Sequence, residues 1–232
     1  TVLATALPTM AQSFGVEALQ MNVALTAYLL SLAVFLPASG RAADRFGARH
    51  VFRAAIAIFT VGSVLCAQSG SLWALVASRV LQGMGGAMMT PVGRLVLLKT
   101  ATKSELVVAM TWLMLPATAG PILGPPVGGF IATYGSWRLI FFINVPIGLL
   151  GMYLATRFLD QIREESLPKL DTLGAVLSGL GLAALVFGFE TVDRGALPTG
   201  AVVALLGGGL ACLAIYALHA RKAENAILDL RL

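Results

Sequence analysis

One arginine of this chain lies inside a long apolar run. Arg79 stands about seven residues into the stretch Leu72–Leu98, and Gln82 follows three positions later, on the same face of a helix. Seven residues of helix place the guanidinium about 10 Å from the start of the run. A charge at that depth in hydrocarbon costs a few kcal/mol, so we expect it to face a cavity or a partner. The alternative is an arginine whose long side chain reaches back to the membrane surface.

A dense group of charges separates two other apolar runs. The segment Gly40–Arg49 reads GRAADRFGAR and stands between Gln20–Leu36 and Val51–Cys66. We predict a turn here, because Gly40 and Gly47 permit tight backbone and a turn cannot sit in hydrocarbon. Its arginines mark the cytoplasmic surface, where positive charge is retained. The alternative is a solvated turn whose arginines only set the topology, which the order G-x3-D-R-x-G-x-R disfavours.

Glycine and proline are concentrated in the run Leu106–Ala132. Small residues at i, i+4 and i+8 form a flat stripe against which another helix packs closely, and prolines remove N–H donors and bend a helix. The stripe consists of Gly120, Gly124 and Gly128, with Pro125 and Gly129 beside it. We predict a helix built to slide or bend against a neighbour, with a plain small-residue packing seam as the alternative.

No group of residues suggests an enzyme or a metal site. His50 and His219 are far apart, and Cys66 and Cys212 both lie within apolar runs without a metal-ligand spacing. The sequence has no phosphate-binding G-x4-G-K-[ST] loop, which argues against an ATP-driven pump in this chain. We therefore expect no catalytic residue, no metal and no cofactor.

The composition indicates what must hold these residues. The 232 residues are 58% hydrophobic and 12% charged, against about 25% charged in soluble domains, so a bilayer must surround much of the chain. A helix needs about 20 apolar residues to cross it. We predict an all-α membrane protein with one partial span and seven fuller ones. The predicted spans are Thr1–Met10, Gln20–Ser39, Val51–Gln68, Leu72–Leu98, Leu106–Ala132, Leu139–Thr156, Thr172–Phe189 and Gly200–Leu218.

Lysine and arginine are distributed unevenly over the links between these spans. When the spans alternate in direction, 13 of the 16 Lys and Arg residues fall on one side, and only Arg138 and Arg194 fall on the other. This asymmetry predicts a multi-pass protein of the cell (inner) membrane with its charged links in the cytoplasm. The net charge of +5 then reflects topology, and no nucleic acid is expected as a partner.

The longest polar stretch, at residues 157–169, divides the predicted helices into six and two. We predict a transporter bundle over residues 1–159 whose first helix is truncated, and a cytoplasmic link at 160–170. Two extra transmembrane helices follow within 171–218. A cytoplasmic connector at 219–232 is expected to lead to a missing C-terminal bundle.

An internal echo suggests how the six helices are related. The spacing Gly40-x6-Gly47 recurs as Gly128-x6-Gly135, three spans later and on the opposite side of the membrane. We predict the same turn geometry at both places, and with it a 3+3 inverted repeat, which is common in secondary transporters.

Three of these segments, in order, resemble signatures of the major facilitator superfamily. Gly40–Arg49 is similar to the loop signature between its second and third helices, although Ala42 replaces the usual Leu and Ala48 the usual basic residue. The stretch Leu75–Ala87, L-x3-R-x2-Q-G-x-G-x-A, resembles the fourth-helix signature. Gly120–Gly129 resembles the fifth-helix antiporter signature, which implies export.

One further segment points to a branch of that family. Trp137–Gly148, W-R-x3-F-x-N-V-P-I-G, is similar to the 14-helix drug:proton antiporters, and two extra helices after the first six fit that branch. The resemblance implies an N-terminal six-helix bundle plus two linker helices. It also implies an acidic residue of the first helix, ahead of Ala6-Leu7-Pro8, at a position that would precede Thr1.

The resemblance implies roles for the residues quoted above. A conformational latch on the cytoplasmic side would consist of Gly40, Asp44, Arg45, Gly47 and Arg49. Proton coupling would fall to Arg79 and Gln82. The helix interfaces would be shaped by Gly83, Gly120, Gly124, Pro125, Gly128 and Gly129.

We therefore expect part of a secondary active transporter that exports small organic or drug-like molecules in exchange for protons. Its partners would be the substrate, protons, the lipid bilayer and the missing C-terminal half. An uptake carrier on the same scaffold and a non-transporting membrane scaffold remain alternatives. The candidates for substrate binding are Tyr28, Trp112, Met114 and Asn144, each of which could instead serve helix packing.

Overall fold

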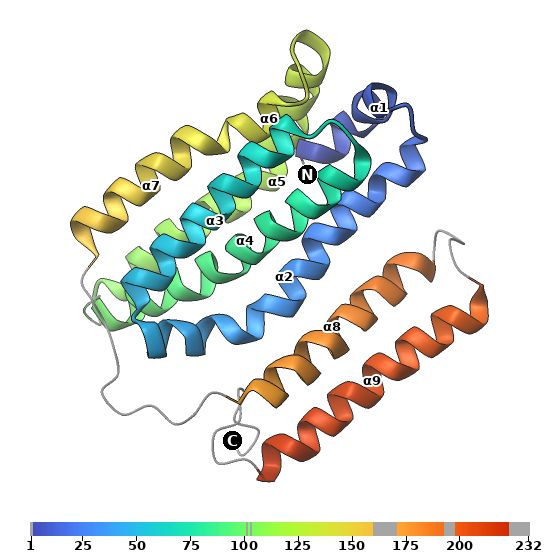
Figure 1. The fold of residues 1–232 in the computed structure, drawn as a ribbon. Coiled ribbons are helices and arrows are strands. Elements are labelled where there is room, and N and C mark those ends of the chain that lie inside the picture. Colours follow the sequence, from blue (N-terminus) through green and yellow to red (C-terminus); the bar gives the residue numbers. More distant parts are fainter. Residues whose placement is uncertain (1, 101, 103, 160–170, 193–197, 223–232) are drawn as a thin grey trace.

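The computed structural model describes residues 2–100, 102, 104–159, 171–192 and 198–222. These residues form helices and, within the described ranges, no strand (Figure 1). The helices are α1 (Val2–Phe14), α2 (Ala18–Phe46), α3 (Ala48–Gln68), α4 (Leu72–Thr100), α5 (Leu106–Tyr134), α6 (Leu139–Phe142), α7 (Asn144–Phe158), α8 (Thr172–Val192) and α9 (Thr199–Lys222). The predicted all-α class is confirmed. The predicted link at 160–170 and most of the predicted connector at 219–232 lie outside the described residues.

Five helical segments in the described part are long and apolar enough to cross a membrane: α2, α3, α5, α9 and α6–α7 taken together. The other two full spans expected from the sequence, α4 and α8, are also helical, and α8 includes the apolar segment Leu173–Phe189. The described residues of α4 do not reach the hydropathy of the other spans. Helix α4 carries Arg79, Gln82 and several glycines in its middle, which lower its mean hydropathy.

The predicted turn at Gly40–Arg49 is wrong in its extent. Helix α2 continues through Phe46, α3 begins at Ala48, and Gly47 alone separates them. Gly47 has φ +88°, a conformation that L side chains rarely adopt. Gly40 lies within α2 and has open space around its Cα. A helix satisfies its own backbone hydrogen bonds, so α2 can extend past hydrocarbon without the long turn that we expected.

The span expected at Leu139–Thr156 is divided into α6 and α7 at Ile143. Pro146 lacks the N–H that would bond to the Phe142 carbonyl four residues earlier, which accounts for a break at this place. Ile143 itself keeps helical torsions, with φ −61° and ψ −26°. Helix α7 therefore follows α6 almost as its continuation.

The repeated spacing Gly40-x6-Gly47 and Gly128-x6-Gly135 does not produce the same turn twice. Gly47 has φ +88°, whereas Gly135, its counterpart between α5 and α6, has φ −139°. Gly40 and Gly128 both lie within helices rather than in turns. The prediction that both turns have the same geometry is therefore wrong, although Gly47 and Gly135 each stand at the end of a long helix.

The helices run alternately up and down, and this brings the basic residues together. The ends of α2, α4 and α7 and the start of α3 meet at one end of the bundle, which we call the basic end (Figure 1). The basic residues described there are Arg41, Arg45, Arg49, Arg53, Arg94, Lys99 and Arg157. Arg138, between α5 and α6, lies at the opposite end.

Helices α8 and α9 form a hairpin that packs on α2 (Figure 1). A Cβ at Gly179 of α8 would lie 3.1 Å from the carbonyl oxygen of Val34, so these two backbones approach closely. Within the hairpin, a Cβ at Gly181 would lie 2.8 Å from the side chain of Leu213. Small residues therefore set both contacts of the hairpin, as is usual where helices meet in a membrane.

Candidate functional site

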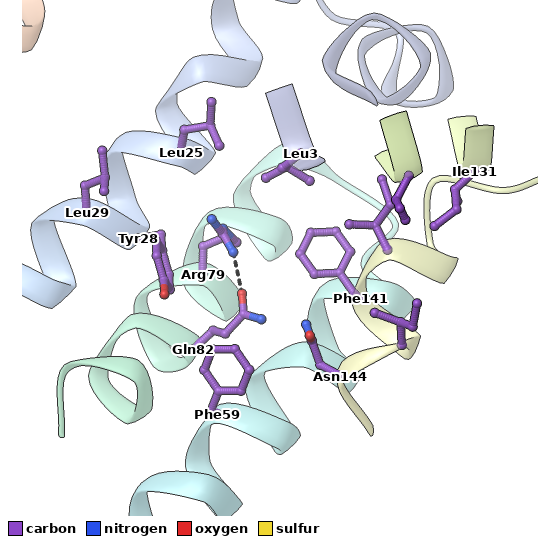
Figure 2. A pocket seen from close by; sticks show the side chains of 13 residues that line it. Leu3, Leu25, Tyr28, Leu29, Phe59, Arg79, Gln82, Ile131, Phe141 and Asn144 are labelled. Carbon is purple, nitrogen blue, oxygen red and sulfur yellow. Dashed lines mark hydrogen bonds between the residues drawn. The ribbon is translucent and has the colours of Figure 1, made fainter. Parts of the chain in front are cut away.

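A cavity of about 410 Å³ lies where α1 to α7 converge (Figure 2). Most of its wall is aliphatic and aromatic, including Phe59 of α3 and Phe141 of α6. Its polar lining residues are Tyr28, Arg79, Gln82 and Asn144. A largely apolar pocket with a few convergent polar groups is the usual form of a small-molecule site.

Arg79 points into the bundle and not toward the membrane surface. The residue is 8% exposed. Its Nε donates to the carbonyl oxygen of Ala24 on α2 at 3.3 Å, and one terminal nitrogen donates to Gln82 Oε1. The guanidinium also lies over the Tyr28 ring, 4.2 Å from its centroid, and 5.8 Å from that of Phe141. The snorkelling alternative is therefore not what the structure shows.

Among the residues that the structure describes, no carboxylate forms an ion pair with Arg79. Within the described ranges, the groups that contact its charge are one carbonyl, one amide and two aromatic rings. Such dipoles and ring faces attract a cation without cancelling its charge. The wall of the cavity consequently carries a fixed positive charge in otherwise apolar surroundings.

Gln82 extends the polar contact from α4 to two further helices. Its Nε2 donates to Ser63 Oγ on α3 at 2.6 Å, and Asn144 Nδ2 on α7 donates to the same oxygen at 3.4 Å. The Cys66 thiol lies 3.8 Å from Gln82 Oε1. Ser63 and Gln82 are 0% and 2% exposed. A chain of hydrogen bonds thus joins Arg79 to Asn144 in the cavity wall.

Glycines hold the helices of this site backbone to backbone. A Cβ at Gly83 would lie 2.7 Å from the Tyr28 carbonyl oxygen, which brings α4 against α2. A Cβ at Gly85 would lie 2.5 Å from the Phe59 nitrogen, and one at Gly62 would lie 2.7 Å from the Gln82 nitrogen, which brings α4 against α3. The helix-interface role expected of Gly83 agrees with this geometry.

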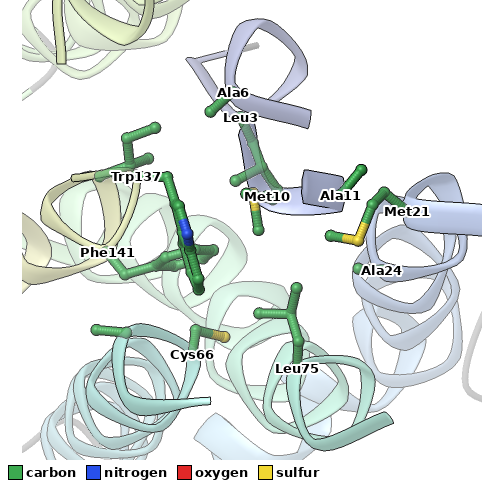
Figure 3. Close-up of a cluster of buried hydrophobic side chains, with 12 residues drawn as sticks. Leu3, Ala6, Met10, Ala11, Met21, Ala24, Cys66, Leu75, Trp137 and Phe141 are labelled. Atoms are coloured by element: carbon green, nitrogen blue, oxygen red, sulfur yellow. The ribbon is translucent and has the colours of Figure 1, made fainter. Parts of the chain in front are cut away.

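A cluster of buried side chains lies toward the end of the bundle opposite the basic end (Figure 3) and shares Leu3, Ile140 and Phe141 with the cavity wall. Met10 of α1, Cys66 of α3 and Leu75 of α4 are fully buried in it, and Trp137 and Phe141 are 2% exposed. The indole Nε1 of Trp137 donates to Ser13 Oγ at 3.1 Å, so its polar atom is satisfied. These contacts pack α1, α3, α4 and α6 together at that end of the bundle.

At the basic end, two of the predicted latch residues bridge helices. Asp44 Oδ1 lies 3.9 Å from Lys99 Nζ, which connects the end of α2 to the end of α4. Arg49 donates to the carbonyl oxygen of Thr156, which connects the start of α3 to the end of α7. Arg45 is exposed and lies over the ring of its neighbour Phe46.

The residues predicted to form a flat stripe on α5 differ in their burial. Gly124 and Gly128 are buried, and α1 is the helix that packs most against α5. Gly120 and Gly129 have no atom within 4 Å of a Cβ built on them. Pro125 is exposed beside them, and α5 remains one helix through all four of its prolines.

The four candidates for substrate binding do not meet in one place. Tyr28 and Asn144 line the cavity. Trp112 and Met114 of α5 are 70% and 47% exposed and lie outside it. Sequence reasoning placed them by residue type alone, and they lie in a stretch of α5, residues 106–123, that has no buried residue.

A second ionic contact, which sequence reasoning missed, joins the residue before α8 to the end of α9. Asp171 Oδ1 lies 3.0 Å from His219 Nε2 and accepts the Gly174 N–H at 2.8 Å. Burial raises the pKa of the Asp171 carboxyl, but the Gly174 N–H, the His219 ring and the charge of Arg41 together lower it further, to below its ordinary value. The only available signal was that both residues stand at the charged ends of the predicted hairpin.

Ser63, Lys99 and Thr156 were also not foreseen. Each makes its contact with a residue of another helix, 19 or more positions away in the sequence, and nothing in the residue types indicates it. No group of three or more metal-binding side chains occurs within the described ranges.

Comparison with known proteins gives a family. The model of the Major Facilitator Superfamily matches residues 1–220. Proteins named "Putative multidrug resistance protein MdtD" are similar over the whole chain: 45% identical in Pectobacterium atrosepticum, 44% in Cronobacter sakazakii and 43% in Salmonella paratyphi B. The chain spans about half the length of these relatives, 50%, 49% and 49% respectively.

Proposed function

Because this chain belongs to the Major Facilitator Superfamily, we propose that it is the N-terminal half of a secondary transporter that exports small organic molecules in exchange for protons. The observation that carries the proposal is the guanidinium of Arg79, buried in the wall of a 410 Å³ cavity. The relatives named for multidrug resistance, of which the chain covers about half, support the direction of transport. The fifth-helix resemblance supports it independently.

The proposed architecture is a six-helix bundle of two inverted triplets over residues 1–159, followed by the linker hairpin within 171–218. The helix contacts support the inverted repeat, since α1 packs on α5 as α4 packs on α2, and α3 packs on α7. In such a repeat α1 corresponds to α4, α2 to α5, and α3 to α6 and α7 counted as one helix. The contact of α1 with α5 then corresponds to that of α4 with α2, and the contact of α3 with α7 corresponds to itself. The C-terminal half of the longer protein would complete the cavity.

Arg79 would act in this transporter through its charge. A guanidinium remains protonated in proteins, and a fixed cation favours the deprotonated form of an acid placed beside it. An acidic group of the longer protein, or of the substrate, would therefore lose its proton when it approaches Arg79 and regain it on withdrawal. Gln82 holds the guanidinium in place for this role.

The basic end would face the cytoplasm, in agreement with retention of positive charge on that side. There Asp44 and Arg49, which link α2 to α4 and α3 to α7, would form part of a latch with Gly47, Arg45 and Gly40. The latch would close against the other half of the transporter. The membrane would be the cell (inner) membrane.

Transport assays on inverted vesicles that contain the full-length protein test this function. We expect an imposed pH gradient to drive substrate movement and added substrate to release protons. Arg79→Ala should lower proton-driven transport about 10- to 100-fold while the protein stays folded, as judged by size-exclusion chromatography. Arg94→Ala removes an exposed arginine from the same helix and should leave transport unchanged.

Three results would contradict the proposal. Net flux into intact cells under a physiological gradient would indicate an uptake carrier. Transport by Arg79→Ala equal to that by Arg94→Ala would show that the buried charge has no role, and complete absence of flux in the parent would favour a scaffold.

A further inference from the structure

One buried serine joins three helices in the wall of the cavity. Ser63 Oγ, on α3, accepts hydrogen bonds from Gln82 Nε2 of α4 and from Asn144 Nδ2 of α7. We infer that Ser63 is a positioning residue which couples a substrate held at Asn144 to the Arg79–Gln82 pair. The inference rests on the proposed function of the chain and adds a residue and a route to it.

The orientation of the Gln82 amide is fixed by its charged neighbour. Its Oε1 accepts from the Arg79 guanidinium and faces the Cys66 thiol at 3.8 Å. If the amide turned over, its NH2 group would meet the guanidinium, and two donors would oppose each other in a buried place. Nε2 must therefore point toward α3, where Ser63 Oγ is the acceptor at 2.6 Å.

The loss of that acceptor has a predictable effect. A buried N–H of Gln82 would be left without its partner, at the cost of desolvating an unsatisfied donor. The amide would then be held by Arg79 alone, and with one anchor fewer its hold on the guanidinium would weaken. Ser63 therefore acts on the charged group without touching it.

The α3–α4 side of the serine is the fixed side. A Cβ at Gly62, next to Ser63, would lie only 2.7 Å from the Gln82 nitrogen, so the two backbones are in direct contact at this level. Gly85 makes a second close contact of the same kind, one helical turn along. Gln82 cannot move away from Ser63 without separating these helices.

On the α7 side, the hydrogen bond of the Asn144 side chain is what can change. Asn144 follows directly on Ile143, the residue that separates α6 from α7. Its hydrogen bond to Ser63, at 3.4 Å, is longer than that of Gln82, and its side chain lines the cavity. A ligand in the cavity can therefore reach Asn144 and compete for its amide.

These features define the ligand chemistry and its consequence. A substrate that offers a carbonyl, ether or carboxylate oxygen takes the Nδ2 donor of Asn144 away from Ser63. The serine oxygen then serves one donor instead of two and holds Gln82 more firmly. Occupation of the cavity thus changes how tightly Arg79 is fixed, which links substrate binding to proton release.

The test uses the full-length protein in proteoliposomes. Protons released per substrate bound, the pH profile of transport and KM are measured for Ser63→Ala, with Ser78→Ala as the matched control. Ser78 is also buried, but its hydroxyl donates to Ala74 O within its own helix at 2.7 Å. We expect Ser63→Ala to lower substrate-driven proton release about two- to tenfold and to shift the pH profile, with KM changed less than about twofold. Ser63→Thr, which keeps the hydroxyl, should restore coupling.

A second variant keeps the inference testable if Ser63→Ala does not fold. Asn144→Ala should raise KM and lower proton release per substrate by a similar factor. Combined with Ser63→Ala, it should lower coupling no further, because both changes interrupt the same route.

The possible failures are distinguishable. If the parent couples transport to protons but Ser63→Ala has the pH profile and proton release of Ser78→Ala, the role of Ser63 is wrong and the exporter remains. If the parent transports substrate without releasing protons, the proposed function is wrong, and the inference fails with it.

Discussion

Replacing Gly83 by alanine tests how closely α4 must approach α2. The added Cβ would lie 2.6 Å from Ser31 Cβ and 2.7 Å from the Tyr28 carbonyl oxygen. Carbon atoms in contact normally stay about 3.5–4.0 Å apart, so α2 would have to withdraw by about 1 Å. The obstructing oxygen belongs to backbone and cannot rotate away. The movement would also stretch the hydrogen bond from Ser31 Oγ to the Val80 carbonyl, now 2.6 Å.

The magnitude follows from two opposing effects. Overpacking costs about 1–3 kcal/mol, and a contact against backbone belongs at the upper end. Alanine is favoured over glycine in a helix by about 1 kcal/mol, which offsets part of that cost. We expect Gly83→Ala to reduce the free energy of unfolding by about 2 kcal/mol, which for a protein of this size corresponds to about 4–8 °C in Tm.

The chain offers its own control and its own reporter. Gly93 lies in the same helix, and its Cβ would meet only the Phe52 ring, at an ordinary 3.6 Å, so Gly93→Ala should leave Tm unchanged or raise it slightly. Cys66 is a fully buried free thiol. In a full-length protein with its other cysteines replaced, a thiol-reactive dye would report unfolding at Cys66 alone.

The comparison can refute the reasoning directly. Equal melting temperatures for Gly83→Ala and Gly93→Ala would show that α2 and α4 are not in backbone contact at this level. A more stable Gly83→Ala would show that helix propensity outweighs packing there. Gly85→Ala, which meets the Phe59 nitrogen at 2.5 Å, should behave like Gly83→Ala if the packing is as described.

Two other predictions concern the charged ends of the helices. Asp44→Asn removes the ion pair with Lys99 and should shift the full-length protein between inward- and outward-facing states; unchanged labelling of engineered cysteines on both sides would contradict this. Asp171 has a lowered pKa, so its stabilising effect is present in full above its unfolded pKa of about 4 and is lost as the pH falls through the lower folded value. The Tm difference between the parent and Asp171→Asn should therefore be present near pH 5 and vanish in stronger acid, and a difference that persists unchanged in stronger acid would refute the assignment.

Much of the helical frame could be predicted from the sequence. The ends of α3, α4, α5 and α8 lie within a few residues of the predictions, because apolar runs of membrane length leave few other solutions for the backbone. The exceptions have local causes. The predicted turn after α2 shrank to Gly47, since a helix can leave the membrane without unwinding, and Pro146 divided the span that the apolar pattern presented as one.

The site was foreseen only in part. Arg79 and Gln82 stood out because a charge within an apolar run is costly and needs a reason. Ser63 did not, since a serine in a membrane helix usually bonds to its own backbone, and nothing near it in sequence indicates a partner 19 residues away. Trp112 and Met114 have the residue types of a binding site but are exposed, in a stretch of α5 without buried residues.

The sequence by itself determined that this chain crosses a membrane several times, which end of the helices is basic, and that one arginine lies at depth. These follow from composition and order, because the bilayer imposes length, apolarity and charge asymmetry on each helix separately. Only the tertiary structure decided which faces meet. Glycines without a Cβ let α2, α3 and α4 touch along their backbones, and that closeness places Arg79, Gln82, Ser63 and Asn144 within hydrogen-bonding reach of one another.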